Sequence, residues 1–247
     1  METVVYAERK GIPLEADLFR SASADPLIVF CHGGGWITGF RDDYHDEARW
    51  WREQGISCAC VSYRLAPLNP FPAAVADLQD FVRYARAKGH ERIVAFGNSA
   101  GGHIAAMLAL SDDYFGPDDD ATGFKADAAI AICPITDMTN PRESQFPVGW
   151  PFVEQFVGSL DAEDALLKAA SPLFHASCGD GPVLLIHGEE DEIVPVDQSR
   201  RLFEALKGFG TPSELHVLPG ETHAFSWPAW QRIRELARAW IHQSVAS

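Results

Sequence analysis

The sequence predicts an α/β fold of three layers, in which helices cover both faces of a mostly parallel central sheet. Short, continuous apolar runs alternate along the chain with amphipathic stretches, which is the pattern of buried parallel strands and covering helices. With 247 residues, of which 47% are hydrophobic, the chain has enough apolar side chains for a sizeable core. We therefore expect residues 1–247 to form a single domain.

The expected strands and helices follow from the period of the apolar residues. Residues 4–7 and 14–19 are expected to form an antiparallel pair, because the second run alternates apolar and polar side chains. The remaining strands are expected at 27–31, 56–61, 93–96, 128–133, 183–186 and 214–218. Helices are expected at 42–54, 73–88, 100–110, 197–206 and 228–245, where apolar residues recur every three or four positions.

The alternation breaks between residues 138 and 172, where prolines stand among aromatic residues. These are Pro141, Pro147, Pro151 and Pro172, with Phe146, Trp150, Phe152 and Phe156 between them. One interpretation is a small lid inserted after a strand, over the sheet edge where ligands bind in open α/β folds. The alternative is a surface excursion with its own small core.

Composition and charge exclude several classes of partner. The formal net charge of −15 argues against binding nucleic acid or an anionic membrane surface, because both would repel the chain. No apolar run approaches the about 18 residues of a membrane span, and the first residues lack a secretory signal pattern. The five cysteines show no C-x-x-C spacing, which favours reduced thiols in the cytoplasm. The terminal strands and helices leave room for a homodimer, although nothing in the pattern demands one.

The most informative motif is Gly97-Asn98-Ser99-Ala100-Gly101-Gly102, which lies between an expected strand and an expected helix. A strand, a sharp turn and a helix form the setting of a nucleophile elbow. The small neighbours of Ser99 fit such a strained turn, where larger side chains would collide. Ser99 is therefore the predicted nucleophile.

A second glycine-rich segment, His32-Gly33-Gly34-Gly35-Trp36, follows the expected strand 27–31. Successive glycines let backbone N–H groups face a ligand, so this segment is a candidate oxyanion hole. We assign the donors to the N–H groups of Gly34, Gly35 and Ala100. Each such donor is typically worth about 3 kcal/mol of the barrier to acyl transfer.

The predicted acid and base follow the last two strands. Asp191 is the predicted acid, although Glu189, Glu190 and Glu192 stand beside it in a loop that a solvated acidic turn would also explain. His223 is the predicted general base, because it lies on the loop after the final strand. We expect His187 to end a strand, and His32 to brace the glycine segment.

Together these residues give the chain a resemblance to the α/β-hydrolase superfamily, in which the chain order is serine, acid, histidine. It resembles carboxylesterases of the hormone-sensitive-lipase and feruloyl/acetyl-esterase-like branch. The segments Ser62-Tyr63-Arg64-Leu65-Ala66-Pro67 and Phe71-Pro72-Ala73-Ala74, with Asp77, also look like this branch. Leu68 stands where many members have an acid, and arylformamidase-like relatives share glycine loops that end in tryptophan.

The resulting hypothesis is a serine hydrolase that cleaves carboxylic esters of short-chain or aromatic acids through an acyl-enzyme. It requires no metal or organic cofactor, and its partner is a small-molecule ester. Trp36, Trp150 and Phe225 are candidates for the substrate pocket, with core packing as the alternative. An arylformamidase and a non-catalytic ligand receptor are the competing hypotheses. A long-chain lipase and a prolyl-oligopeptidase-type peptidase fit less well, because the chain is short.

Overall fold

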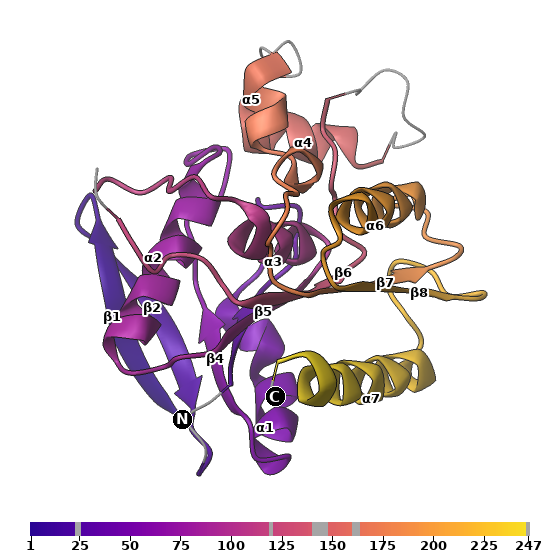
Figure 1. Ribbon diagram of the computed structural model, residues 1–247. Helices are drawn as coiled ribbons and strands as arrows, with labels where there is room; N and C mark the ends of the chain where they lie inside the picture. The colour runs from indigo at the N-terminus through magenta and orange to yellow at the C-terminus, as the bar shows by residue number, and fades with distance from the viewer. Residues whose placement is uncertain (23–25, 119–120, 140–147, 160–163, 246–247) are drawn as a thin grey trace.

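The computed structural model describes residues 1–22, 26–118, 121–139, 148–159 and 164–245 and is built around one eight-stranded sheet (Figure 1). The strands are β1 (Glu2–Arg9), β2 (Ile12–Phe19), β3 (Leu27–Cys31), β4 (Ser57–Val61), β5 (Ile93–Asn98), β6 (Ala128–Ile132), β7 (Val183–Gly188) and β8 (Ser213–Leu218). Their order is β1-β2-β4-β3-β5-β6-β7-β8. The β1–β2 and β2–β4 pairs are antiparallel, and the strands from β4 to β8 pair in parallel.

Helices cover both faces of this sheet. The helices are α1 (His45–Glu53), α2 (Ala73–Ala87), α3 (Ala100–Leu110), α4 (Trp150–Val157), α5 (Asp164–Ala169), α6 (Asp197–Phe209) and α7 (Trp227–Ser244), with short 3₁₀ helices η1 (Arg41–Tyr44) and η2 (Pro172–Phe174). Figure 1 shows α3 and α6 on one face of the sheet and α1 and α7 on the other. The expected three-layer α/β architecture is confirmed.

The sheet divides the hydrophobic core into two parts, one on each face, as expected for strands that are apolar on both sides. Every residue of β3, β4 and β6 is buried, because side chains on both faces of these strands meet helices. Side chains of α2 and α3 pack on one face, and those of α1 and α7 pack on the other. None of the described helices combines the length and the apolarity that crossing a membrane requires.

The parallel strands bring the predicted site residues to one edge of the sheet. The glycine segment follows β3, Ser99 follows β5, Asp191 follows β7 and His223 follows β8. Because the carboxyl ends of parallel strands lie at the same edge, residues far apart in the sequence converge there.

Part of the predicted insertion 138–172 falls outside the described residues, including Pro141, Phe146 and Pro147. In the described part, α4 lies against the glycine segment: the Phe156 ring stacks on Trp36, with centroids 4.3 Å apart. Phe156 also meets the ring of Phe71, which lies shortly before α2. The apolar face of α4 is thus buried against residues that follow β3 and β4.

The segment after β4 is tied to α2 by a buried ion pair. Asp77 is fully buried and accepts hydrogen bonds from the Arg64 backbone N–H at 2.9 Å and from its guanidinium at 2.8 Å. The same segment reaches the glycine loop, because the N–H of Ala66 donates to the carbonyl of Trp36 at 2.9 Å. These bonds connect α2, the segment after β4 and the glycine loop.

Candidate active site at the carboxyl edge of the sheet

Ser99 occupies a sharp turn between β5 and α3. Its backbone has φ 57° and ψ −123°, a conformation that a residue with a side chain rarely adopts. The turn is held by the Ser99 N–H, which donates to the carbonyl of Ile132 in β6 at 2.8 Å. It also needs small residues nearby, because a Cβ on Gly101 would lie 2.0 Å from the carbonyl oxygen of Cys31. The predicted strand–turn–helix setting is therefore present.

The glycine loop after β3 leaves backbone donors unused. Gly34 and Gly35 have φ values of +100° and +60°, which favour glycine. A Cβ on Gly35 would lie 2.6 Å from the Phe152 ring of α4, so this position has no room for a side chain. Within the described chain, the N–H groups of Gly34 and Gly35 donate to no other group, and neither does that of Ala100 at the start of α3.

His32 and Tyr63 support the first residues of the glycine loop. The Tyr63 hydroxyl donates to the carbonyl of His32 at 2.8 Å, and the two rings stack with centroids 4.1 Å apart. Burial lowers the pKa of His32, against the opposing effect of its 2.9 Å contact with the carbonyl of Gly33. A neutral His32 therefore braces the loop, as the sequence predicted.

Asp191 is the acidic residue that the structure brings to His223. Its Oδ2 lies 2.7 Å from Nδ1 of His223, and its Oδ1 accepts the backbone N–H groups of Ile193 at 2.9 Å and Val194 at 2.7 Å. Glu189, Glu190 and Glu192 are exposed, and Glu192 touches only the backbone N–H of His223, at 3.3 Å. The four-acid loop thus contains one buried carboxylate side chain that orients the imidazole.

The surroundings of Asp191 keep its carboxylate charged. Burial acts to raise the pKa of Asp191, but hydrogen bonds from His187, His223 and the Val194 backbone, with the charge of His223, hold it far below its usual range. Asp191 is therefore ionised at neutral pH and can stabilise a protonated His223.

The Asp191 contact occupies Nδ1 of His223 and leaves Nε2 facing away from the acid. The His223 side chain is 14% exposed, whereas that of Asp191 is fully buried. Among the described residues, neither His223 Nε2 nor Ser99 Oγ makes a hydrogen bond. In the absence of substrate, the hydrogen bond between a catalytic serine and its base is often long or poorly aligned, and it tightens when substrate binds.

His187 and Cys133 also contact Asp191, and the sequence did not single out either residue for this role. His187 is fully buried, with Nε2 at 2.8 Å from the carbonyl of Val194 and at 3.3 Å from Asp191 Oδ2, and with Nδ1 at 2.7 Å from Ser199 Oγ. Burial, with the charge of Asp191, raises the pKa of Cys133 and keeps its thiol protonated. The spacing of His187, four residues before Asp191 at the end of β7, was the available signal.

Cys133, His187 and Asp191 also offer ligand atoms within 4.8 Å of one another, a spacing that a metal ion could use. Both nitrogens of His187 are engaged in hydrogen bonds, however, with Ser199 Oγ and with the carbonyl of Val194. A metal ion would have to displace one of these bonds to reach an imidazole nitrogen. The cluster therefore fits a hydrogen-bonding role around Asp191.

The structure places Trp36 inside the core. Its side chain is 1% exposed, its indole stacks on Phe156, and its Nε1–H donates to Nδ1 of His103 at 3.1 Å. His103 is buried, and its Nε2 lies 2.8 Å from the carbonyl of Ala170. Trp36 thus packs between the glycine loop and α4, and its contact with a substrate stays a prediction that requires α4 to move.

The other two predicted pocket residues also have packing partners. Trp150, the first residue of α4, is 8% exposed in the core beside Phe156. Phe225, two residues after His223, has φ 29° and packs near Trp230 of α7, with ring centroids 6.5 Å apart. Whether an aromatic side chain faces the core or a cleft depends on the tertiary packing, which a local pattern does not contain.

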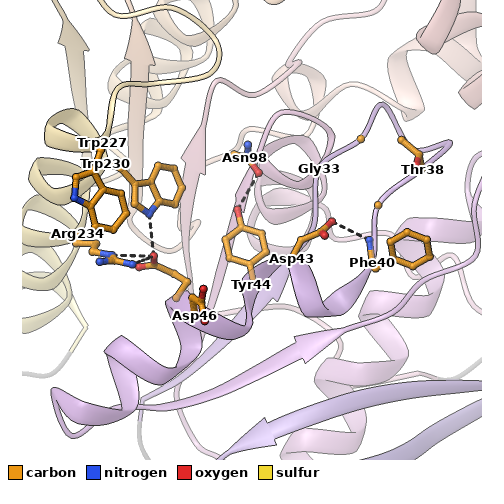
Figure 2. Close-up of a pocket in the computed structure, with 13 residues that line it drawn as sticks. Gly33, Thr38, Phe40, Asp43, Tyr44, Asp46, Asn98, Trp227, Trp230 and Arg234 are labelled. Atoms are coloured by element: carbon orange, nitrogen blue, oxygen red, sulfur yellow. Dashed lines mark hydrogen bonds and ion pairs between the residues drawn. The ribbon is translucent and has the colours of Figure 1, made fainter.

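A cavity of about 640 Å³, here called the α1–α7 pocket, lies beside the site. Its lining residues are Gly33, Gly34, Thr38, Gly39, Phe40, Asp43, Tyr44, Asp46, Glu47, Asn98, Trp227, Trp230 and Arg234 (Figure 2). It adjoins Ser99 through Asn98 and the glycine loop through Gly34. On its other side it reaches Trp227, four residues after His223.

The strand order, the turn at Ser99 and the Asp191–His223 pair define an α/β-hydrolase. A model of the BD-FAE family matches residues 18–206, which is most of the chain. The chain belongs to this family, and the resemblance predicted from its motifs is confirmed.

Several curated relatives are esterases. Esterase LipQ of Mycobacterium tuberculosis is 31% identical over 226 residues, covering 87% of this chain and 53% of that protein. Ethyl acetate hydrolase of Pseudomonas putida is 29% identical over 246 residues, covering 88% of this chain and 73% of that protein. The chain spans about half the length of the mycobacterial esterases that it matches.

Solved esterase structures share the whole described fold. Est2, a thermophilic esterase of Thermogutta terrifontis, with propionate bound, superposes with a TM-score of 0.83 at 27% identity, covering 98% of this chain and 93% of that one. The same esterase phosphonylated by sarin superposes with a TM-score of 0.86 at 27% identity, covering 98% and 94%.

Burial of His103 predicts a specific loss of stability in acid. Burial lowers the pKa of His103 to about 4, although the carbonyl of Ala170 opposes this effect. Its unfolded pKa is about 6.5, so the unfolded chain binds more protons than the native one between pH 4 and 6.5. The stabilisation that neutral, buried His103 contributes to the native state is complete above pH 6.5. It is lost as the pH falls toward 4, which lowers the free energy of unfolding by up to about 3 kcal/mol.

The measurement is urea unfolding from pH 4 to pH 8 for the wild type and for His103→Gln, whose amide does not titrate. We expect the free energy of unfolding to fall more steeply with acid in the wild type than in the variant. Equal slopes would contradict a buried, neutral His103.

Proposed function

We propose that this chain is a serine esterase in which Ser99 is the nucleophile, His223 the general base and Asp191 the residue that orients His223. The observation that carries the proposal is the 2.7 Å contact between Asp191 Oδ2 and His223 Nδ1, at the edge of the sheet where the strained turn presents Ser99. The esterase relatives support this assignment.

In the first half of the reaction, His223 Nε2 takes the proton from Ser99 Oγ as the oxygen attacks the ester carbonyl. The tetrahedral intermediate then collapses, the bond to the alcohol oxygen breaks, and His223 gives its proton to the departing alcohol. In the second half, water gives a proton to His223 and attacks the acyl-enzyme. Collapse of that intermediate releases the acid and returns the proton to Ser99.

The unused N–H groups of Gly34, Gly35 and Ala100 are the proposed oxyanion hole. Negative charge forms on the former carbonyl oxygen in both tetrahedral intermediates, and preorganised donors lower its free energy. The left-handed conformation of the glycine loop and the packing of Phe152 over Gly35 support this role, because they hold the loop in one conformation.

Small acyl groups are the proposed substrates. Est2 has been solved with propionate and with butyrate bound, and the Pseudomonas relative is an ethyl acetate hydrolase. We propose that the insertion 138–172 acts as the lid of a single domain and closes the acyl side of the site through α4. Trp36 and Trp150, which pack in the core with α4, would then limit the length of the acyl chain when α4 moves to admit the substrate.

A substrate panel tests this function. We expect nitrophenyl acetate and butyrate to be hydrolysed faster than nitrophenyl octanoate, methyl ferulate or N-formylkynurenine, because aromatic side chains fill the space around Gly35. Ser99→Ala should lower kcat by a factor of about 10⁴ or more, since it removes the nucleophile.

The control for folding is the circular dichroism spectrum of Ser99→Ala beside that of the wild type. Full turnover by a folded Ser99→Ala variant would overturn the assignment of the nucleophile. N-formylkynurenine as the fastest substrate would instead identify an arylformamidase.

His187 is expected to act as a positioning residue, because it contacts Asp191 and not the substrate. His187→Phe keeps the ring but removes both nitrogens, so Asp191 loses one hydrogen-bond donor. Hydrogen bonds to charged groups contribute about 1.5–3 kcal/mol, so we expect kcat on nitrophenyl butyrate to fall roughly 10- to 100-fold with KM nearly constant.

The matched variant is His187→Gln, whose amide can still donate to Asp191 and should restore most of kcat. A merely structural role would appear as equal losses in both variants, accompanied by lower thermal stability. That result would remove His187 from the mechanism.

A further inference from the structure

The α1–α7 pocket is placed to receive one part of an ester bound at Ser99. Its walls include Gly34, a proposed oxyanion donor, and Asn98, which precedes Ser99. They also include Trp227, which begins α7 just after the His223 loop. In the proposed mechanism the departing alcohol takes its proton from His223, so the alcohol lies on the His223 side of the carbonyl. The pocket borders this side of the site through Asn98 and Trp227, and its volume of about 640 Å³ is that of a small-molecule site.

The pocket exposes aromatic faces. Phe40, which directly precedes η1, is 68% exposed, and Trp227 of α7 is 62% exposed. The guanidinium carbon of Arg234 lies 5.2 Å from the ring centroids of both Trp227 and Trp50, so one face of Trp227 already attracts a cation of the protein itself. Glu47 neutralises this guanidinium, and the remaining exposed surface of Trp227 is the part of the indole open to a ligand cation.

The pocket also carries an excess of negative charge. Asp43, Asp46 and Glu47 line it, and Arg234 is the one cation among its described lining residues. Glu47 is buried and neutralises Arg234 at 2.8 Å, while also accepting the Nε1–H of Trp230 at 2.9 Å. Asp43 separately accepts a hydrogen bond from the backbone N–H of Phe40 at 2.9 Å, which Figure 2 shows as a dashed line. Among the described residues, Asp43 pairs with no cation, and Asp46 pairs only with the exposed Arg49.

We propose that the α1–α7 pocket binds the alcohol part of the ester and selects alcohols that carry a positive charge, such as a quaternary ammonium group. This inference rests on the proposed esterase function and narrows its substrate class. A quaternary ammonium cannot donate a hydrogen bond, and it is recognised by aromatic faces and nearby carboxylates, which are the groups that this pocket presents.

The test compares two esters of the same shape: butyrylcholine and 3,3-dimethylbutyl butyrate, in which carbon replaces the charged nitrogen. Each kcat/KM is divided by the rate of alkaline hydrolysis of the same ester, which removes the difference in leaving-group reactivity. At low salt we expect butyrylcholine to be preferred about fivefold or more, and this preference should shrink at about 0.5 M sodium chloride.

The double variant Asp43→Asn with Asp46→Asn tests the origin of that preference. Asparagine keeps an oxygen that can accept the Phe40 N–H, so the loop is retained while two negative charges are removed. We expect the preference for butyrylcholine to fall at least threefold. The control is Glu8→Gln on the exposed strand β1, far from the pocket in the sheet order, which changes the net charge but should leave the preference unchanged.

If the double variant does not fold, inhibition of the wild type tests the same proposal. Choline should inhibit hydrolysis of nitrophenyl butyrate competitively and at lower concentration than 3,3-dimethylbutanol. Equal inhibition by the two alcohols would overturn the proposal.

The outcomes separate this inference from the proposed function. If nitrophenyl butyrate is hydrolysed through Ser99 but the neutral ester matches or exceeds butyrylcholine, the cation site is wrong and the esterase stands. An equal fall in preference for Glu8→Gln would assign the effect to the net charge and also overturn the site. If no ester is hydrolysed, the proposed function fails, and this inference fails with it.

Discussion

The strained turn at Ser99 is the constraint on which the rest of the site depends. A residue with φ 57° and ψ −123° persists only where surrounding contacts hold it, and here β5, β6 and α3 do so. The contacts are so close that Gly101 has no room for a Cβ against the carbonyl of Cys31. The glycine loop that follows β3 is thereby placed beside the turn, and the N–H groups of Gly34 and Gly35 donate to no group in the described part of the chain. The contacts that hold the turn thus also keep the predicted nucleophile close to the end of β3, from which the proposed oxyanion donors follow.

Electrostatics around Asp191 complete this arrangement. A buried carboxylate is costly unless it accepts several hydrogen bonds, and Asp191 accepts from the Ile193 and Val194 backbones and contacts His223 and His187. The same contacts lower its pKa and fix the orientation of His223, so the site gains a charged acid without exposing it. Beside the site, Glu47 of α1 contacts Arg234 and Trp230 of α7 and lines the α1–α7 pocket.

Local sequence patterns predicted the fold and the strand–turn–helix setting of Ser99, because both depend on the residue types within short segments. Continuous apolar runs mark parallel strands, and the bounds of the strand Leu27–Cys31 and the helix Ala100–Leu110 agree with the prediction. Of the roles that the sequence did not reveal, the packing of Trp36 depends on a tertiary contact, because α4 folds over it. The contact between His187 and Asp191 is local, and it depends on the conformation of the turn after β7. The α1–α7 pocket joins segments almost 200 residues apart, which no local pattern indicates. A cytoplasmic location and a homodimer stay predictions.

The central claim is that the turn after β5 presents Ser99 as the nucleophile, and covalent labelling tests it most directly. The intact protein would be treated with a fluorophosphonate, digested, and mapped by mass spectrometry beside the His223→Ala variant. We expect one adduct, on the peptide that contains Ser99, with labelling much slower in the variant because the general base is absent. An adduct at another residue with Ser99 unmodified, or no adduct on the folded wild type, would contradict the account.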